Sequence, residues 1–296
     1  MAADPRADIL RDDPFTKPQP TKIHHIHPRE ESMPHILRSM FNVKMRREVE
    51  IHTGNIWHFS EEEKAHLLLA TAAFTLALGL MSVGGILRIG DAGGTSTWLL
   101  LLLLSMPVML IAVGPAFIIH EIGHKVVARR YGCWAEFRAD PKGLQTGVLI
   151  SMILGIVFMA PGAVMVAGMV SKKQNGHIAA AGPLVNLSLF IIGVPLGGIL
   201  LGLSGATEFS NYDYIEDGKL IWQAMVYDVV RFWITANLIL GLFNMLPFGP
   251  LDGLKVKAWN VGAFYLLISV FAVPLLCWFL GIWSPMETTV SIANLL

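Results

Sequence analysis

The chain has 296 residues, of which 54% are hydrophobic and only 15% are charged, and its formal net charge is zero. A soluble domain of this length carries about 25% charged residues. The mean hydropathy of +0.56 therefore excludes an ordinary soluble enzyme, and the zero net charge gives no sign of a nucleic-acid-binding protein. The two cysteines lie far apart in the sequence, so no disulfide framework is expected.

Long uncharged blocks account for the hydrophobic excess. Each is at least as long as the roughly 20 apolar residues with which a helix crosses a bilayer. They cover residues 67–87, 92–119, 144–171, 178–207, 232–251 and 258–286. We therefore predict an all-α polytopic membrane protein with about six membrane segments, in which a polar N-terminal tail (1–64) precedes a membrane domain (65–296).

The distribution of Lys and Arg predicts the orientation of these segments. With the tail inside, the full spans would cover 65–88, 98–128, 178–204, 220–247 and 258–283. The inner loops then hold nine basic residues and the outer loops two, as the positive-inside rule requires. We expect a multi-pass protein of the cell membrane whose N-terminus faces the cytoplasm.

The block 144–171 fits this orientation only if it enters the membrane and returns to the same side. A full crossing would place Lys172 and Lys173 outside and would reverse every later span. We therefore expect a re-entrant helix from about 145 to 160, followed by a strand that begins near Pro161, because non-helical backbone is tolerated at membrane depth beside a wet cavity. An ordinary extra span is the alternative, since Gly and Pro are also common in spans.

The motif His120-Glu121-Ile122-Gly123-His124 stands at the inner end of the second predicted span and has the form H-E-x-x-H. On a helix, residues i and i+4 share a face, so His120 and His124 can bind one zinc ion while Glu121 accepts a proton from the attacking water. The motif alone is weak evidence. Inside a membrane segment, however, ionisable residues are rare and indicate function; side chains merely exposed at the helix end are the alternative.

A catalytic zinc ion needs a third protein ligand and an open fourth position. The stretch NMLPFGPLDG (244–253) stands at the inner end of the predicted span 220–247, on the same side of the membrane as the H-E-x-x-H motif. Pro247 and Pro250 break the helix there and free the backbone to turn a side chain toward the metal. Asp252 is therefore the candidate third ligand.

The order of these motifs resembles the site-2 protease family of intramembrane zinc metalloproteases. Between H-E-x-x-H and N-x-x-P-x-x-P-L-D-G, the stretch AAAGPLVN (179–186) looks like the family's A-G-P-x-x-N, and MAPGAVMV (159–166) looks like its membrane-embedded strand. The resemblance covers about 60–285 and looks closest to the archaeal-type members. The chain departs from the minimal pattern in its long tail and in an insertion around 138–160, and no PDZ or CBS module is evident.

The resemblance implies a zinc metalloendopeptidase that cuts a transmembrane segment of a membrane-protein substrate, as in regulated intramembrane proteolysis. His120, His124 and Asp252 would hold one zinc ion, and Glu121 would be the general base. The expected partners are a substrate's transmembrane helix and the lipid bilayer, with no nucleic acid. A catalytically silent zinc-binding scaffold of the same fold is the alternative, against which the intact Glu121 argues. Ligands in one leaflet only argue against a zinc transporter.

Three further residues are candidates for positioning the substrate. Asn186 lies near the expected depth of the zinc ion, where its amide can hold a substrate carbonyl; a hydrogen bond between helices is the alternative. Ala163 and Val164 belong to the expected strand, whose backbone can pair with an unwound substrate. Asn244 is expected to be structural, capping carbonyls that Pro247 leaves free.

Overall fold

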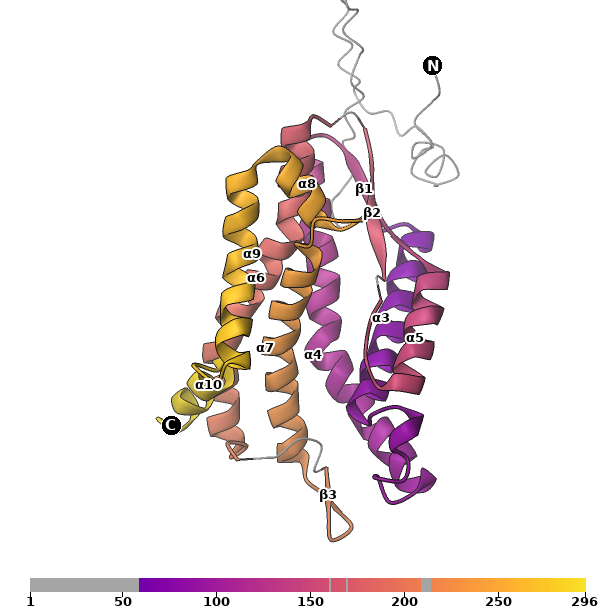
Figure 1. The fold of residues 1–296 in the computed structure, drawn as a ribbon, viewed down its shortest axis with the longest axis vertical. Helices are drawn as coiled ribbons and strands as arrows, with labels where there is room; N and C mark the ends of the chain where they lie inside the picture. The colour runs from indigo at the N-terminus through magenta and orange to yellow at the C-terminus, as the bar shows by residue number, and fades with distance from the viewer. Residues whose placement is uncertain (1–58, 160, 169, 209–213) are drawn as a thin grey trace, which may run out of the picture.

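The computed structural model describes residues 59–159, 161–168, 170–208 and 214–296, most of which are helical (Figure 1). Residues 1–58 of the predicted tail (1–64) lie outside the described residues. Five of the described helices are long and apolar enough to cross a membrane, which makes the chain a multi-pass integral membrane protein and confirms the predicted fold class. They are α3 (Glu61–Ser82), α4 (Thr95–Arg130), α6 (Lys172–Ser204), α7 (Trp222–Asn244) and α9 (Val261–Phe279).

Shorter elements complete the described fold. They are η1 (Ile86–Arg88), α5 (Pro141–Leu154), α8 (Asp252–Trp259), α10 (Pro285–Ala293), and the strands β1 (Trp134–Ala139), β2 (Gly162–Ala167), β3 (Ile215–Glu216) and β4 (Lys219–Leu220). β1 pairs antiparallel with β2, and β3 with β4. Helix α8 lies toward the end of the bundle at which β1 begins, whereas α10 and the β3–β4 hairpin lie at the opposite end (Figure 1).

Helix α3 begins within the stretch that the sequence assigned to the polar tail. Ser60 is its N-cap, and the Ser60 side chain accepts a hydrogen bond of 3.0 Å from the Glu63 N–H. Glu61, Glu62 and Glu63 form the acidic first turn, where carboxylates are stabilised by the free N–H groups and the helix dipole. The polar start of α3 is therefore a capped helix end.

The block 144–171 does not form one crossing helix. Asp140 caps α5 and Pro141 occupies its first turn, so the helix starts earlier than expected. It ends at Leu154, because Gly155 adopts a left-handed conformation with φ 65°. From there the chain returns as β2 toward the end of the bundle at which α5 began (Figure 1). The arrangement agrees with a segment that enters and returns, in a shorter helix than the sequence predicted.

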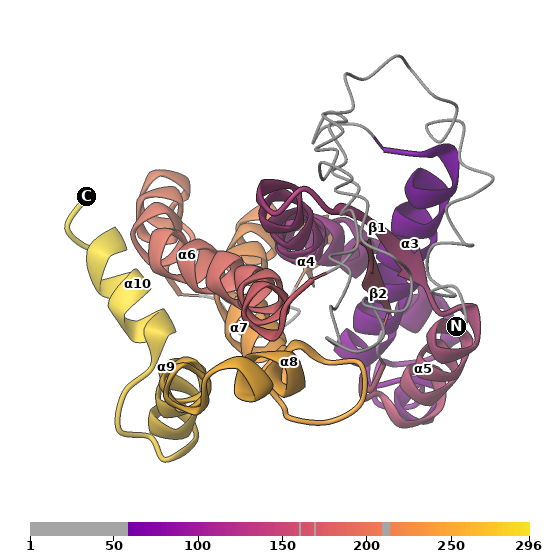
Figure 2. The ribbon, with the colours of Figure 1, turned by 90° about the horizontal axis from the view of Figure 1, so that it is seen from above.

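Helix α6 lies in the middle of the bundle. It packs against α4, α7, α8 and α10 (Figure 2). Because α4 runs beside its N-terminal half and α8 also contacts it, the two sequence motifs on α4 and α8 meet on one side of α6. The fold thereby joins segments that are far apart in the sequence.

Candidate metal centre

The side chains of His120, His124 and Asp252 converge. The histidines are one turn apart on α4, and Asp252 is the first residue of α8. Asp252 Oδ2 lies 3.5 Å from His120 Nε2 and 3.1 Å from His124 Nε2, and the two Nε2 atoms are 3.1 Å apart. All three residues are buried, and one potential ligand atom from each lies within 4.8 Å of the others.

The other nitrogen of each imidazole is held by an oxygen acceptor. His120 Nδ1 lies 2.5 Å from Asn186 Oδ1, and His124 Nδ1 lies 2.7 Å from the Ile178 carbonyl oxygen. These oxygens can only accept, so in the neutral imidazoles each Nδ1 carries the proton and each Nε2 presents a lone pair. Two lone pairs and a carboxylate oxygen then face one another, an arrangement that repels unless a cation lies between them. The donor set therefore fits a metal ion.

Asp252 is held in its charged form by its neighbours. Lys255 Nζ lies 3.3 Å from Oδ1, the carboxylate oxygen other than the Oδ2 atom that faces the histidines. The helix break predicted before Asp252 is present, since α7 ends at Asn244.

Helix α6 approaches the two histidines at a glycine. A Cβ atom on Gly182 would lie 2.4 Å from His120 Nε2 and 2.5 Å from His124 Nε2. Gly123, between the histidines on α4, makes a similar approach, because a Cβ there would lie 2.8 Å from Val185 Cγ2. Gly182 stands in the AAAGPLVN stretch, but the sequence alone did not reveal that its missing side chain leaves room for the histidine pair.

Asn186 is fully buried, and its amide is occupied by protein partners. Its Oδ1 holds His120, and its Nδ2 donates to the Ala116 carbonyl at 3.1 Å and to Asn237 Oδ1 at 2.9 Å. Both N–H groups are used, so none is left for a substrate carbonyl. The geometry favours the helix–helix hydrogen bond over substrate contact, and it adds a role in orienting His120. Asn237, a lone amide in an apolar span, was missed by the sequence reasoning.

A cavity of about 230 Å³ adjoins the converging side chains. Its walls come from α4, β2, the start of α6, the end of α7 and α8. They include Glu121, Ala163, Val164, Asn244 and Lys255 together with His120, His124 and Asp252. Asn244 Nδ2 donates to the Leu240 carbonyl at 3.0 Å, as a structural amide would. The candidate base, the candidate ligands and the predicted strand thus surround one space.

The backbone of β2 is paired on one edge only, as far as the described residues show. The Phe137 N–H of β1 points away from β2 and donates to Glu63 Oε1 at 3.2 Å, and Phe137 stands opposite Val164. In an antiparallel pair, opposite residues alternately exchange hydrogen bonds and point outward. The N–H groups of Val164 and Val166 therefore point to the open edge, whereas that of Ala163 points to β1.

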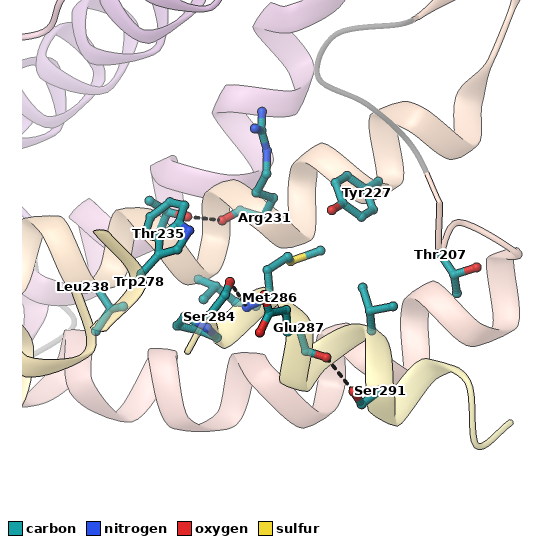
Figure 3. A pocket seen from close by; sticks show the side chains of 13 residues that line it. Thr207, Tyr227, Arg231, Thr235, Leu238, Trp278, Ser284, Met286, Glu287 and Ser291 are labelled. Carbon is teal, nitrogen blue, oxygen red and sulfur yellow. Dashed lines mark hydrogen bonds between the residues drawn. The ribbon is translucent and has the colours of Figure 1, made fainter. Parts of the chain in front are cut away.

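A larger cavity, of about 550 Å³, lies at the opposite end of the bundle (Figure 3). It is bordered mainly by α7, α9 and α10, and its lining mixes apolar side chains such as Leu238, Trp278 and Met286 with polar ones such as Thr235 and Ser291. The Arg231 side chain points away from α10 and pairs with Asp228 at 2.8 Å. Among the described residues, the one group of three His, Cys, Asp or Glu side chains close enough to hold a metal ion is the His120 group, which lies elsewhere.

Comparisons with known proteins agree with this location. The model of "Peptidase family M50" matches residues 108–259, which contain both motifs. "Putative zinc metalloprotease MJ0611" of Methanocaldococcus jannaschii is 39% identical over 154 residues, 52% of this chain and 70% of the relative. "Putative zinc metalloprotease YwhC" of Bacillus subtilis is 28% identical over 162 residues, covering 51% and 68%.

A longer but more partial match is "Putative zinc metalloprotease Rip3" of Mycobacterium tuberculosis. It is 29% identical over 203 residues, which are 69% of this chain and 41% of the relative. The chain thus matches less than half the length of that protein. No solved structure matches the chain.

Proposed function

This chain is a member of peptidase family M50, the site-2 protease family of zinc metalloproteases, and we propose that it hydrolyses a peptide bond within or near a transmembrane segment of a membrane-protein substrate. One observation carries the proposal. The His120 and His124 side chains stand beside Glu121 in α4, a helix long enough to cross a membrane, and they face Asp252 of α8. A soluble substrate would not require that placement, whereas a membrane-spanning one does.

We assign His120, His124 and Asp252 to hold one zinc ion, and Glu121 to proton transfer. A zinc ion held by these three side chains would polarise the scissile carbonyl and would make a water molecule acidic enough to attack near neutral pH. The Glu121 carboxylate takes the proton from the attacking water and delivers it to the nitrogen of the leaving amine. Asn186 and the Ile178 carbonyl keep both imidazoles in the tautomer that presents Nε2.

The open edge of β2 is the proposed binding place for the substrate backbone. Peptide bonds inside a helix are already hydrogen-bonded, so the substrate must unwind locally before it is cut. An unwound segment can add to a free strand edge through main-chain hydrogen bonds. The outward N–H groups of Val164 and Val166 lie on the edge that lines the cavity with Glu121.

Proline at Val164 or Val166 is expected to weaken substrate binding about tenfold. It removes one N–H donor, worth about 1 kcal/mol, and its ring also disturbs the hydrogen bonding of the adjacent strand residue. Zinc content should stay unchanged. Val164→Leu keeps the N–H and is the matched control, with little expected effect. Ala163→Pro differs because it removes a bond to β1, so it should lower thermal stability as well. If a folded, zinc-loaded Val164→Pro protein has the wild-type KM, the strand does not bind substrate.

The orientation can be tested by cysteine labelling in a background that lacks Cys133 and Cys277. We expect Lys142→Cys and Lys173→Cys to react from the cytoplasmic side. Position 210, predicted to face outside, lies outside the described residues, so Lys219→Cys on the β3–β4 hairpin replaces it as the external site. Labelling of positions 142 and 173 from opposite sides would refute the re-entrant arrangement of α5 and β2.

The proposed activity is tested by incubating the purified protein in detergent with a panel of single-span membrane proteins and mapping the products by mass spectrometry. We expect a cut inside or next to the apolar segment, toward the end of the span that faces the cytoplasm. A protein that binds zinc yet leaves every span of the panel intact would support the alternative, a zinc-binding scaffold.

A further inference from the structure

The outer edge of the β1–β2 sheet is covered by side chains of α3. The Phe137 N–H donates to Glu63 Oε1 at 3.2 Å, and the Ala139 N–H donates to His66 Nδ1 at 3.4 Å. Glu63 and His66 are three residues apart, so they stand on one face of α3 and act where a third strand would otherwise pair. Among the described elements, a peptide can therefore extend this sheet at the open edge of β2, beside the candidate base.

The same carboxylate also binds the helix that carries the H-E-x-x-H motif. Glu63 Oε2 lies 2.5 Å from Lys125 Nζ, and Lys125 directly follows His124 on α4. Both side chains are buried, with 2% of Glu63 and 5% of Lys125 exposed. One buried carboxylate thus joins the start of α3, the outer edge of β1 and the turn of α4 next to the histidine pair.

We propose that Glu63 is a positioning residue that fixes where the β1–β2 sheet lies relative to His120 and His124. It would thereby determine which peptide bond of a substrate paired with β2 is cut. The inference rests on the proposed function, because it requires a substrate that pairs with β2. Successive residues of a strand are about 3.3 Å apart. A displacement of the sheet by that distance along its strands would bring the next bond of a paired substrate to Glu121.

The test must separate the loss of the hydrogen bond with Phe137 from the destabilisation that follows when a buried charge loses its partner. Removing one partner of a buried ion pair is strongly destabilising, so single neutral substitutions are unsuitable. We compare two doubly substituted proteins, Glu63→Gln/Lys125→Met and Glu63→Met/Lys125→Met. Both lack the ion pair and have side chains of similar length, but only Gln keeps an oxygen that accepts the Phe137 N–H.

Two single variants complete the set. Glu63→Asp keeps the charge but shortens the side chain by one methylene group, less than the spacing of about 3.3 Å between strand residues, so it should weaken the Phe137 contact and leave the sheet less firmly held. Asp228→Asn is the stability control, because it disrupts a buried ion pair with Arg231 near the other end of the bundle. Each variant is purified in full length, its zinc content and Tm are measured, and its products from one single-span substrate are mapped.

The Gln-containing protein is expected to cut where the wild type cuts. The Met-containing protein and Glu63→Asp should cut at several neighbouring bonds in place of one, with a KM about fivefold higher, as for one lost hydrogen bond. Zinc content should be equal in all. An unchanged single cut and KM in the Met-containing protein would overturn the inference, as would an equal spread of cuts in Asp228→Asn. If the wild type cuts no span, the proposed function fails and this inference with it.

Discussion

Glu121→Gln is expected to abolish detectable cleavage while about one zinc ion per chain remains bound. Gln has nearly the shape of Glu but cannot accept a proton, and general acid–base catalysis contributes a factor of about 10² to 10⁴. Glu121 lines the cavity but is not among the three side chains whose ligand atoms converge. The kcat and the zinc content of the same preparation measure the two roles separately.

Two outcomes of this experiment would contradict the assignment. Activity that persists in Glu121→Gln would mean that another group takes the proton from water. Loss of zinc with the protein still folded would mean that Glu121 is a metal ligand. Val170→Ile, on the wall of the same cavity, is a control for disturbance of the cavity itself and should retain both activity and metal.

Removal of a proposed ligand has the second large expected effect. His124→Ala and Asp252→Asn should each weaken zinc binding by more than a hundredfold, because the loss of an outer partner of a ligand already costs about 10- to 100-fold. Asn186→Leu supplies that milder comparison, since it leaves the three proposed ligands in place but removes the hydrogen bond that orients His120, together with those to Ala116 and Asn237. Competition with a chelator of known affinity measures all three proteins. Wild-type affinity in both His124→Ala and Asp252→Asn would show that the ligand set is wrong.

The parts of the fold set by the bilayer were predictable from the sequence. The apolar helices follow from the length and composition of uncharged blocks, and the pairing of His120 with His124 follows from the helical repeat alone. Charge asymmetry placed Asp252 on the same side as these histidines, and Pro247 and Pro250 predicted the end of α7. These signals are local, so they do not depend on how the helices pack.

The parts that depend on packing were not predictable. Nothing in the local sequence indicates that Asn186 contacts His120, or that Gly182 leaves room for two imidazoles, because both facts depend on how closely α4 and α6 approach. The pairing of β1 with β2 joins segments separated by α5, so no short-range pattern reveals it. The start of α3 could have been recognised, since Ser60 followed by three glutamates is a typical helix N-terminus, and Glu63 would then have attracted attention.

Zinc content and cleavage measured on one preparation test the central claim most directly. The purified protein is assayed in detergent with one single-span substrate before chelation, after chelation and after zinc is restored. We expect about one zinc ion per chain, a cut at the membrane segment, loss of cutting when the metal is removed and recovery when it is returned. Cleavage that survives complete removal of the metal would contradict the account. So would cleavage by a protein that contains no zinc as purified, before any chelation.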